Sequence, residues 1–251
     1  MWKKYPLKYK EETIVSFNED EHRYFVNGKE VKSATTIIDR GLIKPRLLNW
    51  MITTPMYKFK DLINSKLDNN EPIDRATLER IFKEARSKTQ NMKEDGALIG
   101  SVVHGLIEDF IHKKKIPTQS DPKVVNCWNM FLDWWNEQGY EVVEIEKKLY
   151  SKKYNFVGTL DLIVKDKSGK LVLIDIKTSN FISFGYVLQA NAYKFAYEEE
   201  TGNKISSAFC LRLGKTDKKP EIAPMPINKK MFNAFLGAKY ITEQMEESEY
   251  K

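Results

Sequence analysis

The segment from Leu171 to Lys177 constrains the fold more than any other part of the chain. It reads Leu-Val-Leu-Ile-Asp-Ile-Lys, an apolar run that predicts a buried β-strand ending in an acid and a base. Because alternate side chains on a strand point to the same face, Asp175 and Lys177 are expected side by side. A buried charge is costly unless it is paired or bound to a metal. The two residues therefore form either a simple ion pair or part of a metal site.

A second acid, Asp161, lies in the middle of the preceding apolar segment. A short turn at Ser168 and Gly169 joins the two segments, so their strands are expected to pair. Two carboxylates that converge on one sheet repel each other, and a divalent cation relieves that repulsion. Hard cations such as magnesium take oxygen ligands. The alternative is that backbone N–H groups cap Asp161.

Two predicted helices add polar side chains at a spacing of one turn. His104 and Glu108 share one face of a helix expected from about residue 97 to 112, and either can ligate a metal. A single histidine on such a helix also fits a structural role. Gln189 and Tyr193 repeat the spacing on a helix expected from about 184 to 200, where the alternative is a polar helix surface.

The order of the predicted elements indicates an α/β sandwich with a mixed sheet. Strands are expected at 141–150, 156–164, 171–176 and 205–213. Before them, a β-hairpin is expected from Ile14 to Val31 around Asn27-Gly28, because that dipeptide favours a tight turn. Residues 40–95 are expected to be helical but broken, with Pro45, Pro55 and Pro72 as the breaks. We therefore expect a hairpin and helical lobe at 1–95 and a core at 96–251.

Composition excludes several classes of protein. No apolar run approaches the roughly 18–20 residues that cross a bilayer, and the first residues lack the apolar core of a secretory signal. We therefore expect a cytoplasmic protein with no membrane partner. Two cysteines cannot form a structural zinc site or hold a four-cysteine iron–sulfur cluster. The net charge of +6 is only weak evidence for a nucleic-acid partner.

Taken together and in order, the motifs resemble the PD-(D/E)XK nuclease superfamily, in its RecB-like exonuclease branch. The resemblance covers about residues 96–213 and rests on Gly100…His104…Glu108, Gly158…Asp161, Asp175-Ile176-Lys177 and Gln189…Tyr193. The amino-terminal hairpin, with His22, Tyr24 and the Ser-Ala-Thr-Thr run that follows, resembles leading segments of phage-type members. The chain departs from the family in one respect, because the usual proline before the first acid is absent.

The resemblance implies a restriction-endonuclease-like core, with a mixed central sheet flanked by helices, and a metal site. Asp161 and Asp175 would bind Mg²⁺ or Mn²⁺ together with the backbone carbonyl of Ile176. His104 or Glu108 would complete the metal's ligands from the helix, and Glu108 would then take part in catalysis.

The resemblance also implies roles for the remaining motif residues. Lys177 would orient the attacking water and stabilise the charge that builds on the phosphate. Gln189 and Tyr193 would brace the site or hold the nucleic-acid backbone. Phosphodiester hydrolysis needs an activated water, a Lewis acid and help for the leaving oxygen, and these groups supply most of that.

The function that follows is a metal-dependent DNA exonuclease of recombination, repair or phage replication, in the host cytoplasm if viral. A preference for free DNA ends is expected from residues 40–93, where basic and aromatic side chains interleave and can track a strand. The aromatic residues there also fit a small core of the lobe itself. An endonuclease of the restriction or structure-specific type, a catalytically idle nucleic-acid-binding module and a non-nuclease α/β protein are the alternatives. No oligomeric state is predicted.

Overall fold

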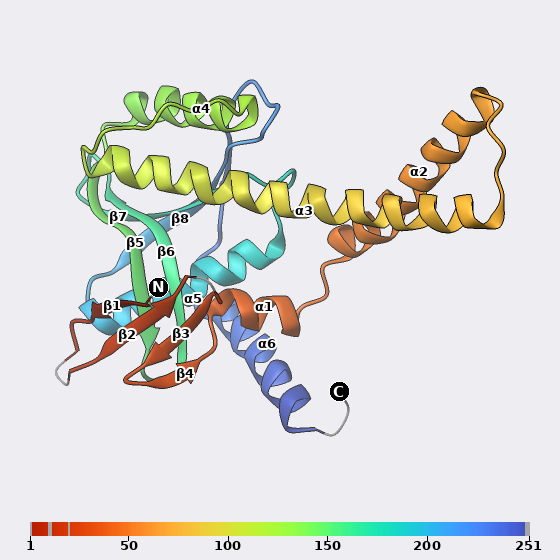
Figure 1. Cartoon of the computed structure of the whole chain (residues 1–251). Coiled ribbons are helices and arrows are strands. Elements are labelled where there is room, and N and C mark those ends of the chain that lie inside the picture. The colour runs from red at the N-terminus through yellow and green to blue at the C-terminus, as the bar shows by residue number, and fades with distance from the viewer. Residues whose placement is uncertain (1, 10–11, 20, 249–251) are drawn as a thin grey trace. The chain divides into compact units, whose positions relative to one another are not determined.

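The computed structural model of the chain describes residues 2–9, 12–19 and 21–248 (Figure 1). The chain divides into two compact units. The sheet unit consists of Met1–Ile43 and Val102–Lys251, and the helical unit consists of Lys44–Ser101. The sequence suggests a single boundary near residue 95, whereas the structure groups the amino-terminal hairpin with the core.

A five-stranded mixed sheet forms the centre of the sheet unit, with the strand order β5-β6-β7-β8-β9. Its strands are β5 (Glu141–Ser151), β6 (Phe156–Lys165), β7 (Leu171–Lys177), β8 (Ile205–Arg212) and β9 (Glu221–Pro224). Only β7 and β8 are parallel, and α5 (Phe184–Thr201) makes the crossover that a parallel pair requires. The predicted α/β class and mixed sheet are confirmed, and β9 is an edge strand that the sequence did not indicate.

Helices cover both faces of this sheet (Figure 1). On one face, α5 and α6 (Lys229–Glu247) pack with α1 (Ala34–Gly41) around a core that includes Leu160, Tyr197 and Phe235. On the other face lies α4 (Pro122–Gln138), whose aromatic stripe packs against the end of α3 and against β8. Asp121 caps α4, since its side chain accepts a hydrogen bond from the N–H of Lys123.

The amino-terminal sheet is a four-stranded antiparallel meander of β1 (Trp2–Pro6), β2 (Ile14–Asn18), β3 (Arg23–Val26) and β4 (Lys29–Val31). Asn27 and Gly28 both have positive φ, as a tight hairpin turn between β3 and β4 requires, so the predicted hairpin is confirmed. Valines of this sheet pack against Val157 of β6. The meander therefore lies against the β5–β6 hairpin of the central sheet.

The helical unit contains α2 (Pro45–Asp68) and the first part of α3 (Arg75–Ile111). The expected break at Pro55 is wrong, because this proline lies inside α2, whereas Pro72 lies in the loop between the helices. The end of the helical segment expected at 40–95 and the helix expected from about residue 97 are one continuous helix. Gly96 and Gly100 do not interrupt it, since a glycine costs a helix only about 1 kcal/mol. None of the described helices combines the length and apolar character needed to cross a membrane.

The close approach of α5 to β6 leads to a testable prediction at Gly158. A Cβ atom there would lie 2.4 Å from Cε1 of Tyr193, whose ring is buried. We expect Gly158→Ala to lower the free energy of unfolding by roughly 1–3 kcal/mol, because the ring has no room to move. Gly105→Ala on α3 is the matched control, since nothing lies within 4 Å of its added Cβ. Equal urea midpoints for the two variants would contradict the packing argument.

Candidate active site

Two acids and a lysine meet where β6 and β7 pair. The Lys177 ammonium lies 2.6 Å from Oδ1 of Asp175 and 3.4 Å from Oδ2 of Asp161. The backbone N–H of Ile176 also donates to Asp161 Oδ2, at 2.7 Å. The two-residue spacing on β7 thus places Asp175 and Lys177 side by side, and the strand pairing brings in Asp161. The backbone cap considered for Asp161 exists as well, on one of its two carboxylate oxygens.

Asp175 is almost completely buried, and its Oδ2 atom has no hydrogen-bond partner among the described residues. The pKa of Asp175 is raised to about 6, because burial, together with the negative charge of Asp161, outweighs the opposing Lys177 ammonium. A buried polar atom without a partner is rare in folded proteins and calls for an explanation. A bound cation would satisfy this oxygen.

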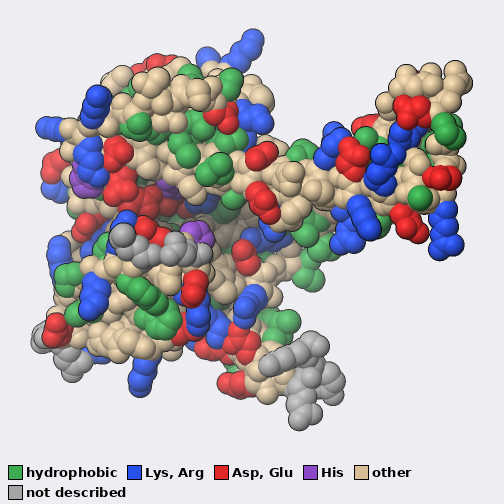
Figure 2. Space-filling model, in the orientation of Figure 1, with side chains coloured by type: hydrophobic (Ala, Val, Ile, Leu, Met, Phe, Trp, Pro, Cys, Tyr) green, Lys and Arg blue, Asp and Glu red, His purple; other side chains and the backbone are tan. Residues whose placement is uncertain are grey.

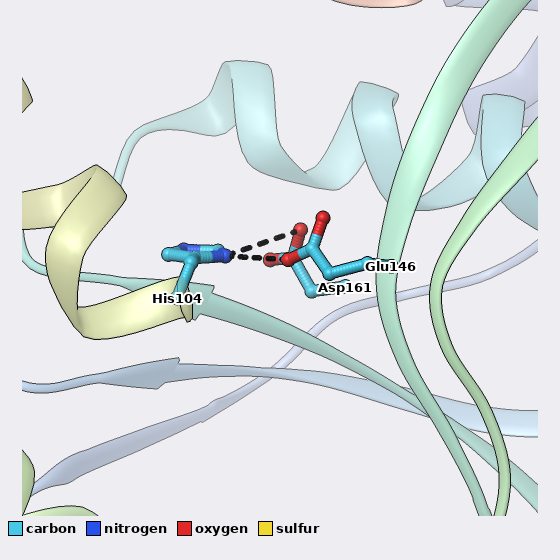
Figure 3. A group of neighbouring side chains, drawn as sticks. All are labelled: His104, Glu146 and Asp161. Atoms are coloured by element: carbon cyan, nitrogen blue, oxygen red, sulfur yellow. Dashed lines mark hydrogen bonds and ion pairs between the residues drawn. The ribbon is translucent and has the colours of Figure 1, made fainter. Parts of the chain in front are cut away.

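His104 reaches the same place from α3 (Figure 3). Its Nδ1 atom lies 3.0 Å from Oε1 of Glu146 and 3.9 Å from Oδ1 of Asp161, and its Nε2 atom lies 3.1 Å from the carbonyl oxygen of Ile176. Burial disfavours the charged ring, but the carboxylates of Asp161 and Glu146 outweigh burial and raise the pKa of His104 to about 9. At neutral pH this pKa makes His104 a cation between the two carboxylates.

Glu146 on β5 is the site residue that the sequence analysis missed. It belongs to a run of charged residues that resembles an ordinary solvated strand. Its place follows from register, because Ile145 pairs with Leu162 and Lys147 with Leu160, which leaves Glu146 opposite Asp161. Glu146 also has a φ of +46°, a conformation that side chains other than glycine seldom adopt and that concentrates at functional sites.

Glu108 is not brought into this cluster. Its side chain is 41% exposed, and its nearest ionic neighbour is His112, with 3.9 Å between Oε1 and Nε2. The close group consists of His104, Glu146 and Asp161, each of which can offer one ligand atom within 4.8 Å of the others. A role for Glu108 as a metal ligand or in catalysis stays a prediction.

Gln189 and Tyr193 are both buried, so the alternative of a polar helix surface does not apply to them. The Gln189 side-chain amide donates to the Tyr193 hydroxyl at 2.9 Å. Burial raises the pKa of Tyr193, and Tyr24 and Asp161 add to the effect, so the phenol remains neutral. The pair lies behind the acids, on the α5 side of β6.

These residues fit a divalent cation. Carboxylate oxygens, a backbone carbonyl and an imidazole are ligands that magnesium or manganese accepts. Asp175, which shares Lys177 with Asp161, adds an unpartnered carboxylate oxygen. Figure 2 shows acidic side chains gathered beside a histidine, whereas Lys and Arg side chains are scattered over the visible face. The local field of the site therefore attracts cations.

Comparisons with known proteins relate the chain to one nuclease superfamily. Residues 124–249, half of the chain, match the sequence model of the PD-(D/E)XK nuclease superfamily. The uncharacterized protein UU146 of Ureaplasma parvum serovar 3 is 30% identical over 93 residues, which are 36% of this chain and 45% of that protein. The chain thus matches less than half the length of this relative. A solved structure from Eubacterium rectale, described as a candidate exonuclease, covers 72% of this chain and 70% of its own, with 11% identity and a TM-score of 0.35.

The position of His104 predicts a pH-dependent stability for the metal-free protein. Its pKa of about 9 exceeds the ordinary 6.5, so the imidazolium stabilises the folded state. That contribution is fully present below pH 6.5 and is lost as the pH rises through 9. We expect the free energy of unfolding to fall by roughly 1–3 kcal/mol across this window. Urea unfolding at a series of pH values in the presence of EDTA measures this free energy. The His104→Gln substitution should flatten its dependence on pH. Parallel profiles for the two proteins would contradict this assignment.

The cluster also predicts how metal affinity depends on the two glutamates. Glu146→Gln removes a carboxylate charge within the close group, so Mn²⁺ affinity should fall roughly tenfold or more. Glu108→Gln makes the same chemical change outside the group and serves as the matched control, with a smaller effect expected. Calorimetric titration without DNA measures both. A larger loss in Glu108→Gln would assign the ligand to Glu108 instead.

Proposed function

Because this chain belongs to the PD-(D/E)XK nuclease superfamily, we propose that it is a Mg²⁺- or Mn²⁺-dependent DNA exonuclease that hydrolyses phosphodiester bonds. The observation that carries the proposal is the unpartnered, buried oxygen of Asp175 beside Asp161 and Lys177. Recombination, repair or phage replication in the cytoplasm are the processes in which such an enzyme would act.

Asp161, Asp175, Glu146, His104 and the carbonyl of Ile176 would hold the metal ion. When bound, the ion supplies Lewis-acid polarisation of the phosphoryl oxygen and lowers the pKa of a bound water. His104 must lose its proton to act as a ligand, and the carbonyl of Ile176 lies 3.1 Å from its Nε2 atom. His104 would therefore have to give up the proton that it holds in the metal-free protein in order to hold the ion.

Lys177 acts as a fixed positive charge. Burial opposes its charge, but Asp161 and Asp175 outweigh burial and raise its pKa well above the ordinary value. In the metal-free protein the ammonium therefore keeps its proton at neutral pH. It can donate hydrogen bonds to the attacking water and to the phosphate, where negative charge develops in the transition state.

Tyr193 and Gln189 support the site from behind. The Tyr193 ring fills the space over Gly158, three residues before Asp161, and Gln189 fixes its hydroxyl. Because both side chains are buried, bracing fits them better than contact with a nucleic-acid backbone. Their packing sets the path of β6 just before the acid.

The exposed aromatic residues of the helical unit support a preference for free DNA ends. Helix α2 has no buried residue, and Tyr57 is 67% exposed. The aromatic residues of α2 thus do not form a closed core of their own, although Phe59 contacts Phe82 across the unit. Exposed rings near lysines can stack on the bases of a single strand. An endonuclease on the same core is the second candidate, since its chemistry would be identical.

One experiment tests both the chemistry and the preference for ends. With Mg²⁺, the protein should degrade linear DNA labelled at an end and spare circular single-stranded DNA, and EDTA should abolish cleavage. Lys177→Ala should lose cleavage by a factor of at least roughly 100 while it still binds DNA, because the lysine acts on the transition state. Rapid cutting of the circle would favour the endonuclease. Full activity of Asp175→Ala in EDTA would end the metal-nuclease proposal.

A further inference from the structure

The amino-terminal sheet lies against the strands that carry the acids, although the family match begins only at residue 124. Several contacts join the two sheets. The Tyr24 hydroxyl and Thr159 Oγ1 are 2.8 Å apart, and the N–H of Val157 donates to the carbonyl of Lys32 at 3.1 Å. Val15 and Val26 also pack on Val157. Residues of the amino-terminal sheet thus border the site at Thr159, two positions before Asp161.

Lys148 is the charged residue at this junction. It lies on β5 two positions after Glu146, and it pairs with Thr159 on β6. Two residues along a strand span roughly 6.6 Å, so the lysine and the proposed metal ligand are neighbours on β5. Its ammonium lies 5.2 Å from the centre of the Tyr5 ring and 5.3 Å from that of Phe17. Tyr24 packs against Phe17 in turn, with 4.5 Å between ring centres.

The partners of Lys148 are unusual for a half-buried lysine. In the described part of the chain, no carboxylate lies within ion-pair distance of its ammonium, which has only the two ring faces. Lys147, next to it, is paired with Glu144 and Glu200. Rings hold a cation in place without neutralising it, and its N–H donors still need acceptors. An anion that arrives here would find a positioned ammonium that no carboxylate contacts, although Glu146 and Glu108 lie near enough to stabilise its charge.

We infer that Lys148, held by Tyr5 and Phe17, binds the backbone phosphate next to the one that is cut. This inference rests on the proposed nuclease function, since the scissile phosphate would lie at the neighbouring acids and metal. A phosphodiester is the anion that a nuclease substrate presents on both sides of the cut. The amino-terminal sheet would therefore position the DNA strand through its backbone, independently of sequence.

The first test measures binding of a single-stranded oligonucleotide to proteins that carry Lys177→Ala, so that no cleavage occurs. Lys148→Met keeps the aliphatic stem on the rings and removes the charge. We expect affinity to fall on the order of tenfold at low salt, and the slope of log affinity against log salt to decrease by about 0.7. Lys148→Arg keeps a cation over the rings and should retain most of the affinity.

Lys4→Met is the matched control, because Lys4 lies on β1 beside Tyr5 but points to the opposite face of the strand. It changes the net charge equally and should alter affinity and slope less. Urea midpoints and Mn²⁺ affinity should stay near those of the parent for every variant. Equal losses in Lys148→Met and Lys4→Met, or lost stability with an unchanged salt slope, would overturn the inference and leave Lys148 as a packing residue.

A second test locates the phosphate. Oligonucleotides carry one neutral methylphosphonate linkage at successive positions from the end. At one linkage the methylphosphonate should lower the affinity of the protein that retains Lys148. It should leave the affinity of the Lys148→Met protein unchanged, because the two changes remove the same contact. Equal effects in both proteins at every linkage would contradict the assignment. Failure of the proposed nuclease function would be distinguishable from failure of this inference. In that case the wild-type protein would cut no DNA with any divalent metal, while the effect of Lys148→Met on DNA binding would persist.

Discussion

The repulsion among three carboxylates is the constraint on which the sheet unit depends. Asp161, Asp175 and Glu146 together carry a charge of −3 when ionised, and His104 and Lys177 lie between them. With both cations protonated the cluster carries −1, since −3 + 2 = −1. If a divalent ion replaces the His104 proton, the sum is −3 + 1 + 2 = 0. The positive charges of His104 and Lys177 thus reduce the repulsion among the carboxylates in the metal-free fold. A divalent ion in place of the His104 proton would bring the net charge of the cluster to zero.

Strand β5 shows how one run of charges serves three separate purposes. Glu146 faces His104, Lys147 neutralises the buried Glu200 of α5, and Lys148 lies on the rings of the amino-terminal sheet. Each side chain binds a different layer of the protein, so β5 joins the site, the crossover helix and the meander. A shift of β5 by one residue would exchange these partners and leave Glu200 uncompensated. The register of β5 is therefore fixed by charge as well as by apolar packing.

The sequence predicted the parts of the site that local rules determine. Alternation on β7 and the short turn before it predict that Asp161, Asp175 and Lys177 converge, and they do. Glu146 was not predicted as a site residue, because its position depends on the pairing between β5 and β6 and on a positive φ. The neighbouring residues in the sequence reveal neither of these. Glu108 shares a helix face with His104, but the spacing of a helix does not determine which side chain reaches a sheet. The continuous helix α3 was not predicted, because the sequence was divided near residue 95 into a helical lobe and a separate helix from about residue 97.

The proton on His104 links the metal-free and metal-bound forms of the protein. In the metal-free form the imidazolium bridges Glu146, Asp161 and the Ile176 carbonyl, so it holds α3 against β6 and β7. A metal ion held by His104 would have to displace that proton, so its apparent affinity would rise with pH until the pKa of about 9 is passed. An ion held by these residues would take the place of that proton. The side chains that would hold it already lie together in the metal-free fold.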